Sequence, residues 1–166
     1  MQTGDTDLPE GAVTTLAARM RLALELALAR SIGRLSRLSG RGGGTTLPGK
    51  ILATIDPNAV TTLAGRLPDG CAVVSATNGK TTTTALVAEI LSPRLRLAHN
   101  HSGANLVSGV ASTLVESGDA QLGLFEVDEG AFPDVARRIE PRAVCLGNLF
   151  RDQLDRYGEL ERIAER

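Results

Sequence analysis

The sequence predicts an α/β fold: a parallel sheet with flanking helices, preceded by an amphipathic helix. From position 71 onward, short apolar segments at 71–75, 95–99, 121–127 and 143–147 alternate with helical patterns. Nearly continuous apolar segments of this length indicate strands that are buried on both faces, as in parallel sheets covered by helices. The turn between the first strand and the first following helix has the sequence TNGKTT, which is typical of a phosphate-binding loop.

The chain before the sheet divides into a tail, a helix and a linker. Residues 1–11 are polar and acidic, which predicts a disordered tail rather than a secretory signal. Residues 12–50 are expected to hold an amphipathic helix, as far as Ser39, and a glycine-rich linker in which Pro48 prevents an immediate new helix. The linker is interpreted as a hinge or as a loop whose glycines approach a ligand. The helix is expected to dock through apolar residues at three- and four-residue spacing: Leu16, Met20, Leu24, Leu28, Ile32, Leu35 and Leu38.

The same segment is basic, and this leaves two interpretations open. Arginines recur along it from Arg19 to Arg41, and the only acidic residue among them is Glu25. The simpler interpretation is a docked helix with a solvated basic edge. The alternative is a peripheral contact with an anionic membrane surface, because interfacial helices combine an apolar face with basic residues.

Residues 51–166 are expected to form an ATP-binding domain that is incomplete at its C-terminal end. Its first helix is predicted to begin at Asp56, as the N-cap before Pro57, and to reach about Leu67. Further helices are expected at 81–91, 105–116, 131–139 and from Glu159 onward. The last of these has no strand after it, so the four predicted strands are interpreted as part of a larger sheet.

The composition argues against several other functions. The formal net charge is −1, and the chain has no Trp and one Tyr, so neither a basic surface nor aromatic stacking supports nucleic-acid binding. The two cysteines, Cys71 and Cys145, each lie in an apolar segment and are interpreted as buried small residues. They form no CxxC pair, which argues against a zinc site or a disulfide framework and favours a reducing, cytoplasmic location.

The strongest functional signal is the segment Ala76–Thr84, which joins a predicted strand to a predicted helix. Such a loop points backbone N–H groups at phosphate oxygens. Lys80 is expected to reach the β- and γ-phosphates of ATP, and the Thr81 hydroxyl to bind Mg²⁺. The full Walker A pattern is not met, because Val74 stands where its first glycine would be. The residues expected to bind the nucleotide are Thr77, Asn78, Gly79, Lys80, Thr81 and Thr82.

An acidic segment, Glu126-Val127-Asp128-Glu129, follows the third predicted strand. Ligands of open parallel sheets bind at the carboxyl ends of the strands, so a carboxylate here is well placed to share Mg²⁺ with Thr81. Glu126 is favoured over Asp128 and Glu129 because it follows the apolar strand directly. The alternative is an acidic loop in which Asp128 or Glu129 caps the next helix.

Two further polar segments are expected at the same edge of the sheet. Asn148 follows the fourth strand and can hydrogen-bond a phosphate or a substrate amide, and Asp152 can bind metal or fix a loop. The loop from Asn100 to Asn105 follows the second strand, and Asn105 is interpreted either as a substrate contact or as the N-cap of a helix. Neither His99 nor His101 is assigned as a general base.

Several of these motifs occur together in an order that resembles the central domain of the Mur ligase family. They are GRGGGTTLPGK, TNGKTTTT, NHSGANL, EVDE and NLFRDQLDRYGE, and they extend from about Arg34 to Arg166. Within the family, the resemblance is closest to the branch that amidates the peptidoglycan precursor lipid II.

The resemblance implies an ATP-dependent ligase in which Lys80 and Glu126 are catalytic and Thr81 and Glu126 hold Mg²⁺. The α-carboxylate of D-Glu in lipid II would become an acyl phosphate, and ammonia would convert it to D-isoglutamine. The ammonia would come from a glutamine amidotransferase subunit similar to GatD. This implies a cytoplasmic enzyme of cell-wall synthesis that acts at the inner face of the membrane.

The sequence departs from the family pattern at two positions. Ala76 replaces the glycine that opens the family's phosphate loop, and its methyl group is a potential obstacle to the phosphates. Gln153 replaces the histidine that helps to bind a second magnesium in many relatives, so no second metal is assigned there. A cysteine ribbon that would bind Zn²⁺, the adenine-binding region and a C-terminal domain are expected only downstream of Arg166.

Two other functions remain open from the sequence. One is a different ligase of the same superfamily, such as a folylpolyglutamate-type enzyme that adds an amino acid. The other is a nucleotide-binding module without catalysis, which Ala76 would favour.

Overall fold

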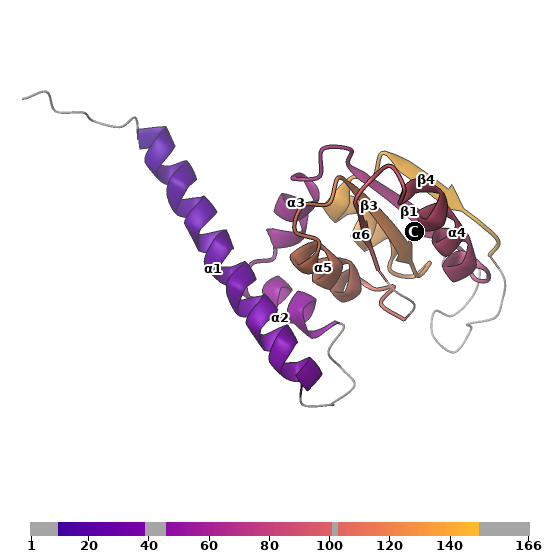
Figure 1. Ribbon diagram of the computed structural model, residues 1–166, viewed down its shortest axis with the longest axis horizontal. Coiled ribbons are helices and arrows are strands. Elements are labelled where there is room, and N and C mark those ends of the chain that lie inside the picture. The colour runs from indigo at the N-terminus through magenta and orange to yellow at the C-terminus, as the bar shows by residue number, and fades with distance from the viewer. Residues whose placement is uncertain (1–9, 39–45, 101–102, 150–166) are drawn as a thin grey trace, which may run out of the picture.

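The computed structural model describes residues 10–38, 46–100 and 103–149 of the chain (Figure 1). The elements follow in the order α1 (Glu10–Leu38), α2 (Leu47–Ile55), α3 (Ala59–Ala64), β1 (Cys71–Ser75), α4 (Lys80–Leu91), β2 (Leu97–His99), α5 (Val107–Glu116), β3 (Leu122–Val127), α6 (Phe132–Ile139) and β4 (Ala143–Leu146). The predicted class is confirmed: helices flank a parallel sheet, and a long helix precedes it. The helix predicted from Glu159 lies outside the described residues.

The four strands form one parallel sheet in the order β2-β3-β1-β4. The connection from β1 to β2 runs in one direction across the sheet, and the connections from β2 to β3 and from β3 to β4 run in the other. Because parallel crossovers are right-handed, α4 covers one face while α5 and α6 cover the opposite one. The register pairs Ser75 with Val127, so the carboxyl ends of β1 and β3 lie side by side. The connections that leave β1 and β3 run in opposite directions, and open parallel sheets bind ligands at the carboxyl ends of such neighbouring strands.

The core lies between the sheet and the helices on the α5 side. Its largest fully buried side chains come from β3, β1 and the helices α2, α3 and α5, and they include Phe125, Leu52, Val60, Val73 and Val110. Burial of these apolar groups is the main favourable contribution to the stability of the domain. β4 differs, because all four of its residues are exposed along the edge of the described sheet.

The docked face of α1 is not the one that the sequence predicts. Met20, Leu24 and Leu28 are 60%, 70% and 50% exposed, whereas Leu22 and Leu26 are buried. The helix packs on α2 and α5 through this second face, as its position beside α2 in Figure 1 illustrates. The prediction failed because α1 is apolar on two faces, and only tertiary packing decides which of them is covered. Within the described parts of the chain, no helix combines the length and apolar character that crossing a membrane requires.

The expected stop at Pro48 is also wrong, because α2 begins at Leu47 and includes this proline in its first turn. A proline is tolerated there since the first amides of a helix have no intrahelical acceptor. The next residue, Gly49, approaches α5 rather than a ligand. A Cβ atom at Gly49 would lie 2.0 Å from the carbonyl oxygen of Ser108, and its amide donates a hydrogen bond of 2.8 Å to Oγ of Ser112.

Two smaller expectations are corrected as well. Asp56 does not cap a helix that runs to Leu67: its Oδ1 accepts from the amide of Asn58, and α3 spans only Ala59–Ala64. Cys71 is buried as predicted, but Cys145 is exposed because it lies on β4. A parallel edge strand has the same apolar sequence as a central one, so sequence alone does not distinguish them.

Candidate functional site

The phosphate-binding loop predicted at 76–82 joins β1 to the N-terminus of α4. Gly79 is the residue before the helix and has φ +81°, a conformation that costs little only for glycine. Asn78 and Gly79 are exposed, while Ala76, Thr77 and Lys80 are buried. The first amides of α4 thus lie next to a solvent-accessible loop, which is the arrangement that attracts phosphate oxygens.

The Thr81 hydroxyl in the first turn of α4 donates a hydrogen bond of 3.0 Å to Oε1 of Glu126. Glu126 lies near the end of β3 and is 3% exposed. The pairing of β1 with β3 brings the two side chains together. A hydroxyl and a carboxylate are hard oxygen donors of the kind that Mg²⁺ prefers, and Mg²⁺ usually takes its remaining ligands from phosphate and water.

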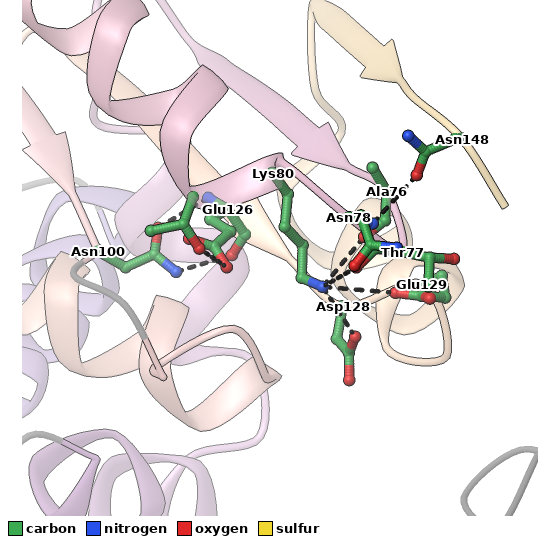
Figure 2. A network of polar contacts seen from close by, with 10 residues as sticks. Ala76, Thr77, Asn78, Lys80, Asn100, Glu126, Asp128, Glu129 and Asn148 are labelled. Carbon is green, nitrogen blue, oxygen red and sulfur yellow. Dashed lines mark hydrogen bonds and ion pairs between the residues drawn. The ribbon is translucent and has the colours of Figure 1, made fainter. Parts of the chain in front are cut away.

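The Lys80 side chain is held within the loop by oxygen atoms from two segments (Figure 2). Its Nζ donates to the carbonyl oxygens of Ala76 at 3.0 Å and Thr77 at 3.4 Å. It also forms ion pairs with Oδ1 of Asp128 at 3.5 Å and Oε2 of Glu129 at 3.7 Å. All three charged side chains are at least nine-tenths buried. Asp128 and Glu129, which were considered as helix caps, therefore lie beside the lysine that is expected to bind phosphate.

Buried carboxylates outnumber cations at this edge of the sheet. Asp128 and Glu129 lie beside Lys80, the buried cation, and Glu126 is buried near the end of the neighbouring strand β3. Because charges interact more strongly when water is excluded, this excess of negative charge favours a bound divalent cation. Among all the residues that the structure describes, these three carboxylates included, no group of three or more His, Cys, Asp or Glu side chains is arranged to hold a metal ion by itself. A metal here would accordingly depend on oxygen atoms from a ligand as well as on the protein.

Asn148 contacts the loop from the end of β4. Its Oδ1 accepts a hydrogen bond of 3.0 Å from the amide of Asn78, and its carbonyl oxygen accepts one of 2.8 Å from the amide of Thr77. Figure 2 shows its side chain directed at the loop. Asn148 thus lies where the sequence predicts, although its visible partner is the loop backbone.

The methyl group of Ala76 is buried next to Gly147, which follows β4. Ala76 is 4% exposed, and a Cβ atom added to Gly147 would lie 2.7 Å from its Cβ. The absence of a side chain at Gly147 therefore makes room for this methyl group. Ala76 therefore packs against the segment that follows β4.

The loop after β2 contributes one residue that sequence reasoning did not single out. Asn100 is 1% exposed and bonds to the main chain of Glu126 through both ends of its carboxamide. The sequence feature that could have indicated Asn100 is its position directly after a predicted strand, at the carboxyl edge of the sheet. Asn105 is half-buried, and its carbonyl oxygen accepts from the amide of Asp128 at 2.9 Å. The residue before α5 is Leu106, so the alternative of Asn105 as the N-cap is wrong by one position.

Some predicted site residues have no structural account. Asp152 and Gln153, and with them the question of a second metal, lie outside the described residues, as does His101. Thr82 lies on the exposed first turn of α4, next to Thr81.

The sequence is similar to those of several known proteins. The family model of the Mur ligase middle domain matches residues 74–166. The lipid II isoglutaminyl synthase (glutamine-hydrolyzing) subunit MurT of Staphylococcus aureus N315 is 34% identical over 145 residues, which cover 86% of this chain and 33% of that protein. The subunit of the same name from Streptococcus pneumoniae R6 is 37% identical over 144 residues, or 82% of this chain and 32% of that protein.

A solved structure shows the same fold. MurF from Acinetobacter baumannii superposes with a TM-score of 0.58 at 20% identity, covering 73% of this chain and 26% of that chain. The chain spans about a third of the length of the MurT relatives that it matches.

Proposed function

The chain belongs to the Mur ligase family, and on that premise we propose that it is the part of an ATP-dependent carboxylate–amine ligase that binds ATP and Mg²⁺. The observation that carries the proposal is the Thr81–Glu126 contact at the end of the phosphate loop. A hydroxyl and a buried carboxylate in contact beside the phosphate loop are the donors that would hold the Mg²⁺ of a bound nucleotide. We also propose three parts of the chain: a tail at 1–11, a helix with a linker at 12–50, and the ATP-binding domain at 51–166.

In this proposal each loop residue has one task. The amides of Asn78, Gly79 and the first turn of α4 bind phosphate oxygens. The Lys80 ammonium leaves its carboxylate and carbonyl partners and neutralises charge on the β- and γ-phosphates. Thr81 and Glu126 hold Mg²⁺, which screens the phosphates when bound. Thr77 and Thr82 complete the nucleotide contacts.

The finer proposal is that the acceptor is lipid II and the amine is ammonia. The γ-phosphoryl group passes to the D-Glu α-carboxylate, which releases ADP and forms an acyl phosphate. Ammonia attacks the acyl carbon and forms a C–N bond, the C–O bond to the phosphate group breaks, and inorganic phosphate and a proton are released, which gives D-isoglutamine. Asn105, Asn148 and Asp152 are proposed substrate contacts. The two similar subunits support this scheme, because their names specify lipid II and glutamine hydrolysis.

The extent of the similarity favours this branch over an amino-acid-adding ligase. The family model begins at residue 74, whereas the match to the S. aureus subunit extends over 145 residues and therefore includes part of the chain before that position. A glutamine-hydrolysing partner subunit similar to GatD is proposed as the source of ammonia.

We further propose that α1 brings the protein to the membrane that contains lipid II, which implies a location at the inner face. Met20, Leu24 and Leu28 form an exposed apolar face. Arg21 and Arg34 are exposed on the same helix. An apolar face with adjacent cations is the composition that binds at the interface of anionic lipids.

Mass spectrometry of lipid II tests the proposed reaction. Protein carrying this sequence is incubated with lipid II, ATP and Mg²⁺, and with glutamine plus the amidotransferase subunit or with ammonium chloride. The expected product has the mass of a carboxyl-to-amide exchange, and its formation stops in the Lys80→Met variant. Addition of an amino acid instead of ammonia would contradict the finer proposal and support the amino-acid-adding alternative. ATP binding without turnover in the complete assembly would support the non-catalytic module.

A further inference from the structure

The ladder between β2 and β3 ends before it reaches Glu126. The last backbone pair is His99 with Leu124, because β2 ends at His99. Glu126 lies two residues further along β3, where the described part of the chain has no further β2 residue to pair with it. Its main-chain N–H and C=O are buried there and need partners, since a buried unpaired peptide group is costly.

The side chain of Asn100 supplies both partners. Its Nδ2 donates a hydrogen bond of 2.7 Å to the carbonyl oxygen of Glu126, and its Oδ1 accepts one of 2.8 Å from the Glu126 amide. The Asn100 carboxamide thus makes the two hydrogen bonds with Glu126 that the backbone of a further β2 residue would otherwise make. The second hydrogen of Nδ2 is used as well, in a bond of 2.8 Å to the carbonyl oxygen of Ala104.

We propose that Asn100 is a positioning residue for Glu126: it fixes the main chain of β3 so that the Glu126 carboxylate stays within reach of Thr81 and of the metal. This inference rests on the proposed function, because it needs Glu126 to be a metal ligand. Asn100 itself acts through Glu126, since both hydrogens of its Nδ2 and its Oδ1 bond to protein atoms. Figure 2 shows its carboxamide next to Glu126. Groups that orient a metal ligand in this way commonly contribute tenfold or more to metal affinity.

The chemistry requires asparagine at this position. The Nδ2 group has two hydrogens to donate, and two carbonyl oxygens, of Glu126 and Ala104, accept them. The Oδ1 atom is an acceptor, and the amide of Glu126 donates to it. Aspartate has the same shape but no donor when ionised, so it cannot bond to the carbonyl oxygens of Glu126 and Ala104. Asn100→Asp therefore disturbs the position of Glu126 with little change in volume.

A magnesium titration of nucleotide binding tests the proposal. The Mg²⁺ concentration for half-maximal ATP binding is measured for wild type, Asn100→Asp and Asn100→Ser. The matched control is Ser112→Ala, which removes another buried hydrogen bond, from Gly49, at the α2–α5 contact on the opposite side of the sheet from α4. Both Asn100 variants are expected to need about tenfold more Mg²⁺ or higher, while their affinity for ATP in EDTA stays at the wild-type value.

The control separates positioning from a general loss of stability. Ser112→Ala is expected to lower the midpoint of thermal unfolding without shifting the Mg²⁺ requirement. An equal Mg²⁺ shift in Ser112→Ala and in the Asn100 variants, or no shift in any of them, would overturn the inference. Wild-type binding that does not depend on Mg²⁺ at all would instead overturn the proposed function, so the two failures are distinguishable.

Discussion

The hydroxyl of Thr81 and the carboxylate of Glu126 are joined by a hydrogen bond of 3.0 Å across 45 positions of sequence. One residue opens the helix after β1, and the other lies near the end of β3. Parallel pairing of these strands makes the two meet at the edge of the sheet where the connections change direction. The nucleotide proposal depends on this contact, and the packing and the charges around it lead to testable predictions.

Removal of Lys80 is expected to destabilise the nucleotide-free protein. Lys80→Met leaves the buried carboxylates of Asp128 and Glu129 without their cation, and such a loss costs on the order of 3 kcal/mol in the free energy of unfolding. Urea denaturation measures the change. Adding Glu129→Gln to this variant should restore part of the stability, because the uncompensated charge is then smaller.

The chain's other lysine provides the control for this experiment. Lys50 is exposed, and Lys50→Met is expected to change stability by less than about 0.5 kcal/mol. Equal effects of Lys50→Met and Lys80→Met would show that the ion pairs of Lys80 contribute nothing.

The α2–α5 crossing is expected to be intolerant of any side chain at Gly49. A Cβ atom there would lie 2.0 Å from the Ser108 carbonyl oxygen and 2.5 Å from the Ser112 amide nitrogen, and both are backbone atoms. Gly49→Ala should lower the free energy of unfolding by about 3 kcal/mol or more. Gly65→Ala is the control, because its nearest contact is 3.4 Å and its φ is −65°. It should be neutral or slightly stabilising, and a Gly49→Ala protein as stable as Gly65→Ala would refute this packing.

The two cysteines should differ in reactivity and in their effect at high pH. Burial raises the pKa of the Cys71 thiol to about 11, while the pKa of an unfolded thiol is about 8.5. Between these values the unfolded chain loses a proton that the folded chain keeps, so stability falls as pH rises, by up to about 1.4 kcal/mol per pH unit. In a Cys145→Ala background, Cys71→Ala should remove this slope from urea denaturation curves.

Alkylation of the native protein checks the same difference directly. Exposed Cys145 should react, and Cys71 should react only after unfolding. Rapid labelling of Cys71 in the folded protein would contradict its burial.

The exposed face of α1 is expected to bind anionic vesicles. Replacing Met20, Leu24 and Leu28 by Gln should lower partitioning onto phosphatidylglycerol vesicles at least about tenfold, because their apolar area no longer enters the interface. Vesicle sedimentation measures this. Leu86→Gln with Ile90→Gln on α4 alters an equally exposed apolar pair and should have no effect. The membrane proposal would be contradicted if both variants lost vesicle binding equally, or if the wild-type protein bound phosphatidylcholine vesicles but not phosphatidylglycerol vesicles.

Sequence reasoning located the strands, most of the helices and the edge where the polar motifs gather, because alternating apolar segments and the parallel-sheet rule constrain these strongly. It did not identify Asn100, whose partners depend on where β2 ends relative to β3. Nor did it choose the buried face of α1, since both faces carry apolar residues. The ion pairs of Lys80 with Asp128 and Glu129 likewise depend on how the loop after β3 turns back toward α4. Each of these features is set by tertiary register rather than by local sequence.

Calorimetric titration of the protein with ATP, in Mg²⁺ and in EDTA, tests the central claim most directly. Wild type should bind ATP more tightly with Mg²⁺ than without it. Lys80→Met should weaken binding in both conditions, whereas Glu126→Gln and Thr81→Val should mainly remove the advantage that Mg²⁺ gives. A folded wild-type protein that does not bind ATP, or Glu126→Gln and Thr81→Val variants that keep the full Mg²⁺ dependence, would contradict the assignment of this site.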